Sequence, residues 1–282
     1  MITQREITTH ETLTPVKAVI YEDSDTAAKA YILYFHGGGL LYGSARDLPL
    51  SHIRALTAAG FSIISYEYPL APASRLDSII SSVSESVTHY IRHREMYTPS
   101  PLPFFLWGRS AGAYLCLITA GHSNLPEKPA GLISYYGYGF LCDSWFCSPS
   151  KYYGSLPAVS EDCLSDSAYV FHTEGSLETC YSLYVYARQT GKWKDLIYTG
   201  REKDFLLKYS LRTCDALPCP LFCAHSMEDP DVPYDEFLAL SGKYHARRFL
   251  APCREHDFDR NADSPVTMRL LRQTVDFLNS CI

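Results

Sequence analysis

One serine has neighbours that suit a nucleophile: Ser110, in the stretch Gly108-Arg109-Ser110-Ala111-Gly112. An apolar run precedes this stretch and another follows it, so it fits G-x-S-x-G at a turn from a strand into a helix. On such a turn the hydroxyl is exposed, the glycines keep side chains away from the backbone, and the helix dipole favours a developing anion. The competing interpretation is a glycine-bounded turn in which the serine only caps the helix.

A glycine-rich loop, His36-Gly37-Gly38-Gly39, follows another predicted strand. Three consecutive glycines let backbone N–H groups approach a ligand, as in the HGGG-type loops that help to form an oxyanion hole. A phosphate-binding loop is the alternative, but neither G-x-G-x-x-G nor G-x-x-x-x-G-K-[ST] is present. We therefore interpret His36 as a brace for this loop rather than as a base.

A serine nucleophile needs a base, and the base needs an orienting carboxylate. In the chain order Ser, acid, His, the preferred candidates are Asp229, after the apolar run PLFCA, and His256, after the run RRFLAP. Each lies just beyond the carboxyl end of a predicted strand, at the edge where open parallel sheets bind ligands. The less favoured alternatives are Asp231 and Glu228 for the acid and His225 and His245 for the base.

The elements that must position these residues alternate along the chain. Short apolar runs alternate with segments of helical period, which predicts an α/β fold with a mostly parallel central sheet and helices on both faces. The predicted strands are 16–21, 31–35, 61–66, 104–107, 131–136, 221–224 and 248–250. The predicted helices are 45–59, 74–93, 110–121, 233–244 and 264–279.

Residues 141–217 break the alternation. They contain no clear buried strand, are rich in Tyr, Ser and Cys, and include amphipathic helical segments such as SLETCYSLYVYARQT. They are too many for a simple loop between two core strands. We predict an α/β core formed by 1–140 and 218–282, with 141–217 as an inserted aromatic-rich helical cap over the carboxyl edge of the sheet.

Composition excludes several classes of partner. The 282-residue chain has a net charge of −6, so it has no basic surface for nucleic acid. No apolar stretch reaches the roughly 18 residues of a membrane span. The first residues carry early charges and no apolar signal region, and with ten cysteines this predicts reduced thiols and a cytoplasmic location. Cys214, Cys219 and Cys223 lack paired C-x-x-C spacing, so no zinc site is expected.

The motifs together resemble the α/β-hydrolases, specifically the hormone-sensitive-lipase-like carboxylesterases. The matching stretches are HGGGLLYGS at 36–44, YEYPLAPASRLD at 66–77, GRSAGA at 108–113, EDPDVP at 228–233 and EHDF at 255–258. They span almost the whole predicted core and leave the cap unmatched. The chain departs from that branch in two places. Arg109 occupies the position where the branch usually has Asp, and the segment at 66–77 differs from the corresponding segment of the branch.

The resemblance implies a mechanism. Ser110 attacks an ester carbonyl while His256 accepts its proton and Asp229 orients the imidazole. The backbone N–H groups of Gly38, Gly39 and Ala111 hold the oxyanion. Water activated by His256 then releases the acid from the acyl-enzyme. No metal or organic cofactor is implied.

The expected function is therefore hydrolysis of small-molecule carboxylic esters with small or medium acyl groups. A peptidase or amidase of the same fold is one alternative, because the same triad hydrolyses amides. A catalytically silent protein that binds a small molecule is the other, because folds host many functions. A homodimer is left open as the oligomeric state.

Overall fold

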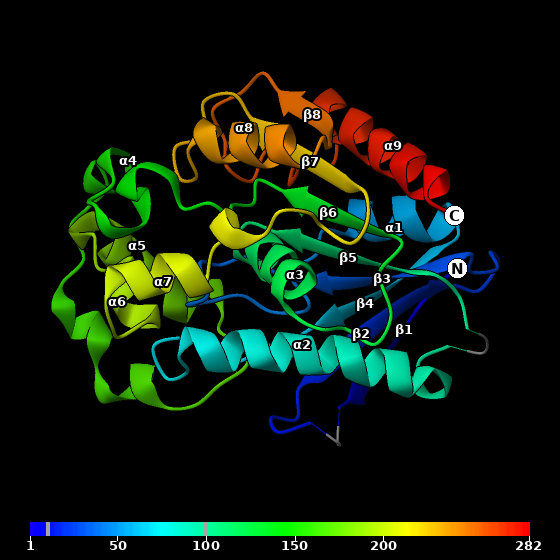
Figure 1. Cartoon of the computed structure of the whole chain (residues 1–282), viewed down its shortest axis with the longest axis horizontal. Helices are drawn as coiled ribbons and strands as arrows, with labels where there is room; N and C mark the ends of the chain where they lie inside the picture. The colour runs from blue at the N-terminus through cyan, green and yellow to red at the C-terminus, as the bar shows by residue number, and fades with distance from the viewer. Residues whose placement is uncertain (10–11, 99–100) are drawn as a thin grey trace.

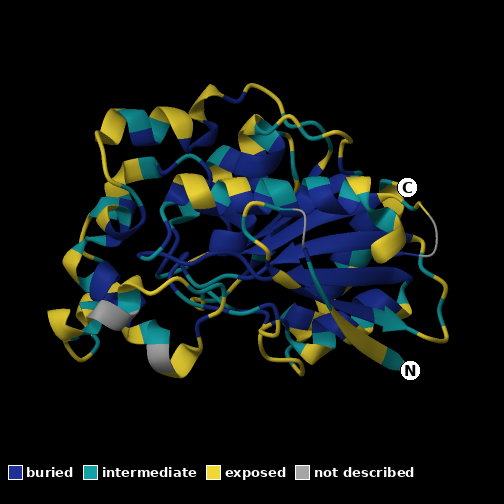
Figure 2. Cartoon of the chain, turned by 90° about the horizontal axis from the view of Figure 1, so that it is seen from below, coloured by how far each residue is buried: buried dark blue, intermediate teal, exposed yellow. Residues whose placement is uncertain are grey.

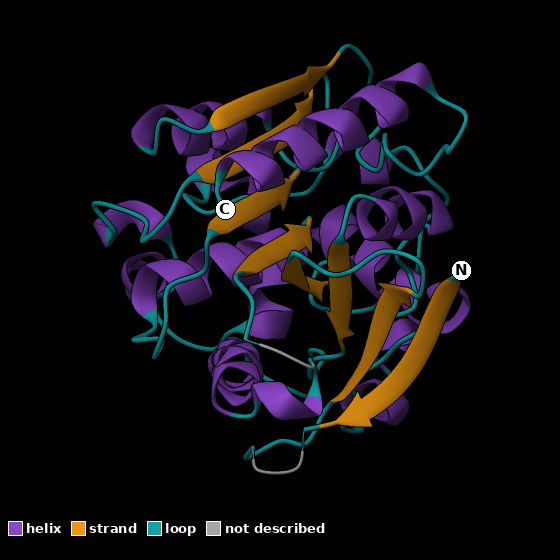
Figure 3. Cartoon of the chain, turned by 90° about the vertical axis from the view of Figure 1, so that its right-hand side faces the viewer, coloured by secondary structure: helices purple, strands orange, loops and turns teal. Residues whose placement is uncertain are grey.

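The computed structural model describes residues 1–9, 12–98 and 101–282. Within them, eight strands form one twisted sheet in the order β1-β2-β4-β3-β5-β6-β7-β8 (Figures 1 and 3). β2 pairs antiparallel with β1 and β4, and the remaining neighbours are parallel. The strands are β1 (Ile2–Thr8), β2 (Lys17–Asp23), β3 (Ala30–Phe35), β4 (Phe61–Tyr66), β5 (Phe104–Arg109), β6 (Gly131–Tyr135), β7 (Leu221–Ser226) and β8 (Arg247–Ala251).

Helices cover both faces of this sheet, and each face has its own apolar core. On one face α1 (Leu50–Ala58) and α9 (Pro265–Ser280) bury side chains against the strands. On the other face α2 (Leu76–Arg92), α3 (Ala111–His122) and α8 (Tyr234–Lys243) do so. Figure 2 shows the central strands buried while the outer sides of the helices are exposed. The predicted α/β fold is confirmed.

Two elements differ from the prediction. β1, with the sequence ITQREIT, is not predicted because it is an edge strand whose central residues are exposed, so its sequence carries no apolar run. The helix predicted from residue 45 begins only at Leu50, after Pro49. Ahead of it, the Ser44 N–H donates to the Asp47 carboxylate at 2.8 Å in a turn.

Between β6 and β7 the chain forms helices on the side toward which β5 and β6 point (Figure 1). All eight strands described above lie in residues 1–140 and 218–282. We therefore propose that 141–217 is a cap over the carboxyl edge of the sheet. Its α-helices are α4 (Lys151–Gly154), α5 (Leu177–Thr190), α6 (Trp193–Ile197) and α7 (Glu202–Lys208). Short 3₁₀ helices occupy Arg94–Met96, Cys142–Cys147, Glu161–Leu164, Asp166–Tyr169 and Leu211–Thr213.

Candidate active site

Ser110 lies at the sharp turn between β5 and α3. Its φ is +52° and its ψ is −118°, a conformation that few non-glycine residues adopt. Both flanking glycines are required, since a Cβ on Gly108 would lie 2.1 Å from the carbonyl carbon of Gly112, and one on Gly112 would lie 2.0 Å from the Phe35 oxygen. The serine side chain makes no capping hydrogen bond to α3, so its hydroxyl is left for another partner.

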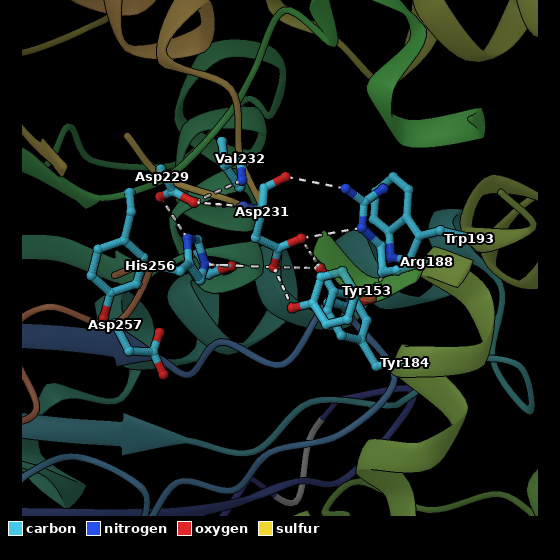
Figure 4. Close-up of polar contacts among 12 residues, drawn as sticks. Tyr153, Tyr184, Arg188, Trp193, Asp229, Asp231, Val232, His256 and Asp257 are labelled. Atoms are coloured by element: carbon cyan, nitrogen blue, oxygen red, sulfur yellow. Dashed lines mark hydrogen bonds and ion pairs between the residues drawn. The ribbon is translucent and has the colours of Figure 1, made fainter. Parts of the chain in front are cut away.

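That partner is His256, and Asp229 holds the far side of the ring (Figure 4). The His256 Nε2 lies 2.9 Å from the Ser110 Oγ, and the His256 Nδ1 lies 2.7 Å from the Asp229 Oδ2. The other oxygen of Asp229 accepts hydrogen bonds from the backbone N–H groups of Asp231 at 2.8 Å and Val232 at 3.0 Å. The structure therefore joins serine, imidazole and carboxylate in one hydrogen-bonded chain.

The charges and hydrogen bonds in this series of three side chains favour an ionised Asp229 and a basic His256. Burial alone would raise the pKa of Asp229, but the charge of His256 and its hydrogen bond hold that pKa below its ordinary value. Burial acts to lower the pKa of His256, but the charge and hydrogen bond of Asp229 outweigh it and raise the pKa to about 9, with Asp231 and Asp257 contributing. With its proton on Nδ1, the neutral ring can accept the Ser110 proton at Nε2.

The less favoured candidates for the acid, Asp231 and Glu228, do not take the position of Asp229 at the Nδ1 of His256. Asp231 faces the other ring nitrogen, with its Oδ2 4.0 Å from the His256 Nε2. It is paired with Arg188, whose Nε lies 3.1 Å from its Oδ1. Glu228 is exposed and pairs with Arg254 at 2.7 Å. Neither carboxylate contacts the Nδ1 of His256, which is the nitrogen that an orienting acid must hold.

The less favoured bases do not reach the serine. His225 is buried at the end of β7, where its Nε2 lies 3.1 Å from the Val232 carbonyl oxygen and 3.6 Å from Asp229. Burial lowers its pKa, so it stays neutral beneath the acid. His245 is exposed just after α8.

Gly38 and Gly39 line the same cleft as Ser110, and Ala111 is the first residue of α3, directly after the serine. In the described part of the chain no acceptor is recorded for the backbone N–H groups of these three residues. Gly38 and Gly39 have φ of +102° and +59°. A Cβ on Gly39 would lie 2.1 Å from the Tyr184 ring, so only glycine fits between this loop and α5. Free donors beside a nucleophile are the requirement for an oxyanion hole.

The segment at 66–77 packs against this glycine loop and forms hydrogen bonds with it. The Tyr68 hydroxyl donates to the His36 carbonyl oxygen at 2.9 Å, and the two rings stack with their centroids 4.2 Å apart. The Ala71 N–H donates to the Leu40 carbonyl at 2.8 Å. His36 is fully buried, with its Nε2 3.5 Å from Glu67. It therefore has the placement of a brace and makes no contact with Ser110.

Arg109, which has no explanation at the level of sequence, forms a buried ion pair. Its Nη2 lies 2.7 Å from the Asp259 Oδ1. The same carboxylate accepts from the Tyr136 hydroxyl at 2.8 Å and lies 2.9 Å from the His52 Nε2. Burial alone would raise the pKa of Asp259, but the Arg109 charge and the hydrogen bonds from His52 and Arg109 hold it well below its usual range. Sequence reasoning missed Asp259 and His52, because neither stands in a motif and both are remote along the chain.

A cleft of about 580 Å³ opens at Ser110 and His256. Tyr181 and Tyr184 of α5, in the proposed cap, form part of the wall of this cleft. In the wall of the cleft, the hydroxyl groups of Tyr184 and Tyr153 donate to the Asp231 carboxylate at 2.8 Å and 3.2 Å (Figure 4). Its aromatic lining consists of Tyr34, Tyr42, Tyr136, Tyr152, Tyr153, Tyr181 and Tyr184.

The fold and this serine-centred site define the class of protein. A family model described as the α/β-hydrolase fold matches residues 32–205. Because this match covers more than half of the chain, the protein belongs to the α/β-hydrolase family, and the predicted resemblance is confirmed.

Comparison with known proteins agrees with this membership. A protein of unknown function from Staphylococcus aureus subsp. aureus Mu50 is 29% identical, with a TM-score of 0.83 and 99% of both chains covered. The Pyrobaculum calidifontis esterase has the same fold at 17% identity and a TM-score of 0.69, over 99% of this chain and 85% of its own. The non-reducing polyketide synthase adrD of Penicillium roqueforti is 29% identical over 140 residues, which are 46% of this chain and only 6% of that protein.

Residues 1–9, 12–98 and 101–282 contain neither a candidate membrane span nor a candidate metal site. None of their helices has the length and apolar character needed to cross a membrane. They also contain no group of three or more His, Cys, Asp or Glu side chains arranged to hold a metal ion.

Proposed function

We propose that this α/β-hydrolase is a serine hydrolase that cleaves carboxylic esters of small molecules through an acyl-enzyme. The observation that carries the proposal is the continuous chain from the Ser110 hydroxyl through His256 to Asp229, at 2.9 Å and 2.7 Å. Such a chain supplies a nucleophile, a general base and an orienting acid, which is the set that acyl transfer needs.

In the proposed mechanism, the Ser110 Oγ forms a bond to the ester carbonyl carbon while the His256 Nε2 takes the hydroxyl proton. The carbonyl oxygen becomes an oxyanion and accepts hydrogen bonds from the backbone N–H groups of Gly38, Gly39 and Ala111. When the tetrahedral intermediate collapses, the bond to the alcohol breaks and His256 gives its proton to the leaving oxygen. A water molecule, deprotonated by the same imidazole, then forms a bond to the acyl carbon. The bond from that carbon to the Ser110 Oγ breaks, His256 returns the proton to this oxygen, and the acid leaves.

The cleft supports substrates of modest size. Its volume of about 580 Å³ and its tyrosine lining offer apolar surface with scattered hydroxyl groups, which suits small or medium acyl groups. An amidase of the same fold would use the same three residues, so the reaction of an amide is the direct comparison.

The test is hydrolysis of an acyl ester series from short to long chains, with an aryl amide of matched acyl group, by the wild type and by Ser110→Ala. We expect ester turnover to exceed amide turnover. We also expect kcat in Ser110→Ala to fall by about 10⁴ to 10⁶, as when other triads lose their nucleophile. Hydrolysis that survives in Ser110→Ala would refute the assignment of the nucleophile.

Two other outcomes would favour the alternatives. Amide turnover above ester turnover, abolished by Ser110→Ala, would identify an amidase. Tight binding of a small molecule with no turnover of any ester or amide would identify a silent binding protein.

A further inference from the structure

Arg109, which precedes the proposed nucleophile, forms an ion pair with Asp259, which follows the proposed base. Arg109 is the last residue of β5, next to Ser110, and Asp259 lies three positions after His256 in the loop between β8 and α9. Their side chains meet at 2.7 Å, although 150 positions separate them in the chain. The exposed fraction of the Arg109 side chain is 4% and that of Asp259 is 0%. This pair is a direct link between the two segments that carry the reacting atoms.

A tyrosine extends the link to the imidazole itself. The Tyr136 hydroxyl donates to the Asp259 Oδ1 at 2.8 Å, while its ring packs edge-on against the His256 ring with centroids 4.7 Å apart. The Arg109 guanidinium lies over the same tyrosine ring, 5.6 Å from its centroid. The face of His256 thus rests on a ring whose position depends on Asp259.

The network is organised around the carboxylate. Asp259 is in contact with three donors, Arg109, Tyr136 and His52, whereas the Nε of Arg109 has no hydrogen-bond partner in the described structure. Among the described residues, loss of Arg109 would leave the buried Asp259 carboxylate with no lysine or arginine within 4.0 Å. An uncompensated buried charge is strongly unfavourable, so the loop that carries Asp259 would have to move.

We propose that Arg109 and Asp259 are positioning residues that hold the His256 loop in register with Ser110. This inference rests on the proposed function, because it assigns the pair a role in the alignment of that base and nucleophile. The pair touches no reacting atom. It acts by fixing where His256 stands, and a displacement of about 1 Å at a catalytic group can cost about 10²-fold in rate.

The test is a double-mutant cycle with steady-state kinetics on the best ester substrate. We expect kcat to fall by about 10²-fold in Arg109→Met and in Asp259→Asn, with a much smaller change in KM, because the main effect is on where His256 stands relative to Ser110. The double variant should lose no more than the worse single variant, because the two residues act as one unit. Arg109→Lys retains the charge without the planar guanidinium, so it should recover part of the lost kcat.

Thr274→Val is the matched control. It removes the 2.6 Å hydrogen bond between the Thr274 and Tyr135 hydroxyl groups, buried on the same face of the sheet, and leaves the ion pair intact. We expect this control to lower Tm and to leave kcat unchanged at temperatures where it is folded. Equal losses of kcat in the control and in Arg109→Met would overturn the proposal, because the effect would then be one of general stability.

The pH profile separates positioning from mere folding. If the ion pair aligns His256 with Asp229, loosening it weakens their hydrogen bond, and the acid limb of the kcat/KM profile moves to lower pH. An unmoved limb together with wild-type kcat in Arg109→Lys and Asp259→Asn would overturn the inference while leaving the proposed function intact. Activity that persists in Ser110→Ala would instead remove the proposed function.

Discussion

At the scale of single residues, the site is governed by how carboxylates surround one imidazole. Asp229 contacts the Nδ1 of His256 at 2.7 Å, and Asp231 lies 4.0 Å from its Nε2. Both negative charges favour the protonated ring, which opposes the effect of burial. The base is therefore strong, and its neutral form is reached only at alkaline pH.

This balance predicts an alkaline pH profile. The pKa of His256 is raised to about 9, and only the neutral ring can take the serine proton, so kcat/KM should increase from pH 7 through pH 9 and then level off. Stability has the opposite sign: the contribution of protonated His256 is complete below pH 6.5 and is lost as the pH rises through about 9. Both are measured on the wild type, by initial rates and by urea unfolding. A limb centred near pH 6.5 would contradict the expected basicity.

The two aspartates predict different effects on substitution. Asp229→Asn removes the acceptor for the Nδ1 proton and should lower kcat by about 10⁴, because the ring is then held in the wrong tautomer. Asp231→Asn keeps that contact and removes a charge near Nε2, so it should shift the acid limb to lower pH with a much smaller loss of kcat. Steady-state kinetics over pH 5 to 10 compares the two variants. The reverse order of damage would transfer the orienting role to Asp231.

At the scale of elements, the turn from β5 into α3 places Ser110, the proposed nucleophile. α3 packs so closely on β3 that the Cα of Gly112 faces the carbonyl oxygens of Phe35 and His36. His36 begins the glycine loop, so the same contact sets the distance between Ser110 and the proposed oxyanion hole. The spacing of the motif G-x-S-x-G therefore reflects packing between a helix and a strand.

Gly112→Ala should damage both stability and activity. Its Cβ would lie 2.0 Å from the Phe35 oxygen, an overlap that costs about 1–3 kcal/mol or more because backbone must move. The matched control is Gly242→Ala in α8, where the added Cβ meets no atom within 4 Å. That change should raise the free energy of unfolding by about 0.5–1 kcal/mol. Urea unfolding of both variants measures the difference, and equal effects would show that the close approach at Gly112 is absent.

At the scale of the whole molecule, the proposed cap is tied to the core at the site. Arg188 of α5 lies with its Nε 3.1 Å from Asp231, and its Nη2 donates to the Asp231 carbonyl at 3.1 Å. Glu236 of α8 accepts from three backbone N–H groups where the chain enters the insertion, at Gly139, Phe140 and Cys142. The segment 141–217 is thus held to the core by buried charges as well as by apolar contact.

Loss of the Arg188–Asp231 ion pair should lower the free energy of unfolding. Arg188→Met leaves the Asp231 carboxylate buried without its cation, so the free energy of unfolding should fall by about 3–5 kcal/mol. Arg201→Gln is the control, since the exposed Arg201–Asp204 pair contributes about 0–1 kcal/mol. Urea unfolding of both variants gives the two values. A loss in Arg188→Met no larger than that in the control would show that the ion pair does not hold the cap.

Most of the fold follows from local patterns. Seven of the strands, from β2 to β8, coincide with runs of apolar residues. The five strands from β3 to β7 are buried at every residue, because a strand covered on both faces leaves a continuous apolar sequence. β1 is not predicted because none of its residues is buried, whereas β8, at the other edge of the sheet, still buries Phe249 and Ala251. The sequence predicts Ser110, Asp229 and His256 as one site because each follows the carboxyl end of a strand, and parallel strands bring those ends to one edge of the sheet. The structure places the three side chains within hydrogen-bonding distance of one another.

By itself, then, the sequence determined the α/β architecture and the set of residues that gather at one edge of the sheet, since both depend on short-range periodicity and on motif order. Tertiary structure decided which of the neighbouring carboxylates contacts His256, and what Arg109 does. Asp229 and Asp231 are two positions apart, and only the path of the loop after β7 brings one to Nδ1 and the other toward Nε2. Arg109 meets Asp259 across 150 positions, a contact that no local pattern encodes because it depends on how β5 and the β8–α9 loop pack together.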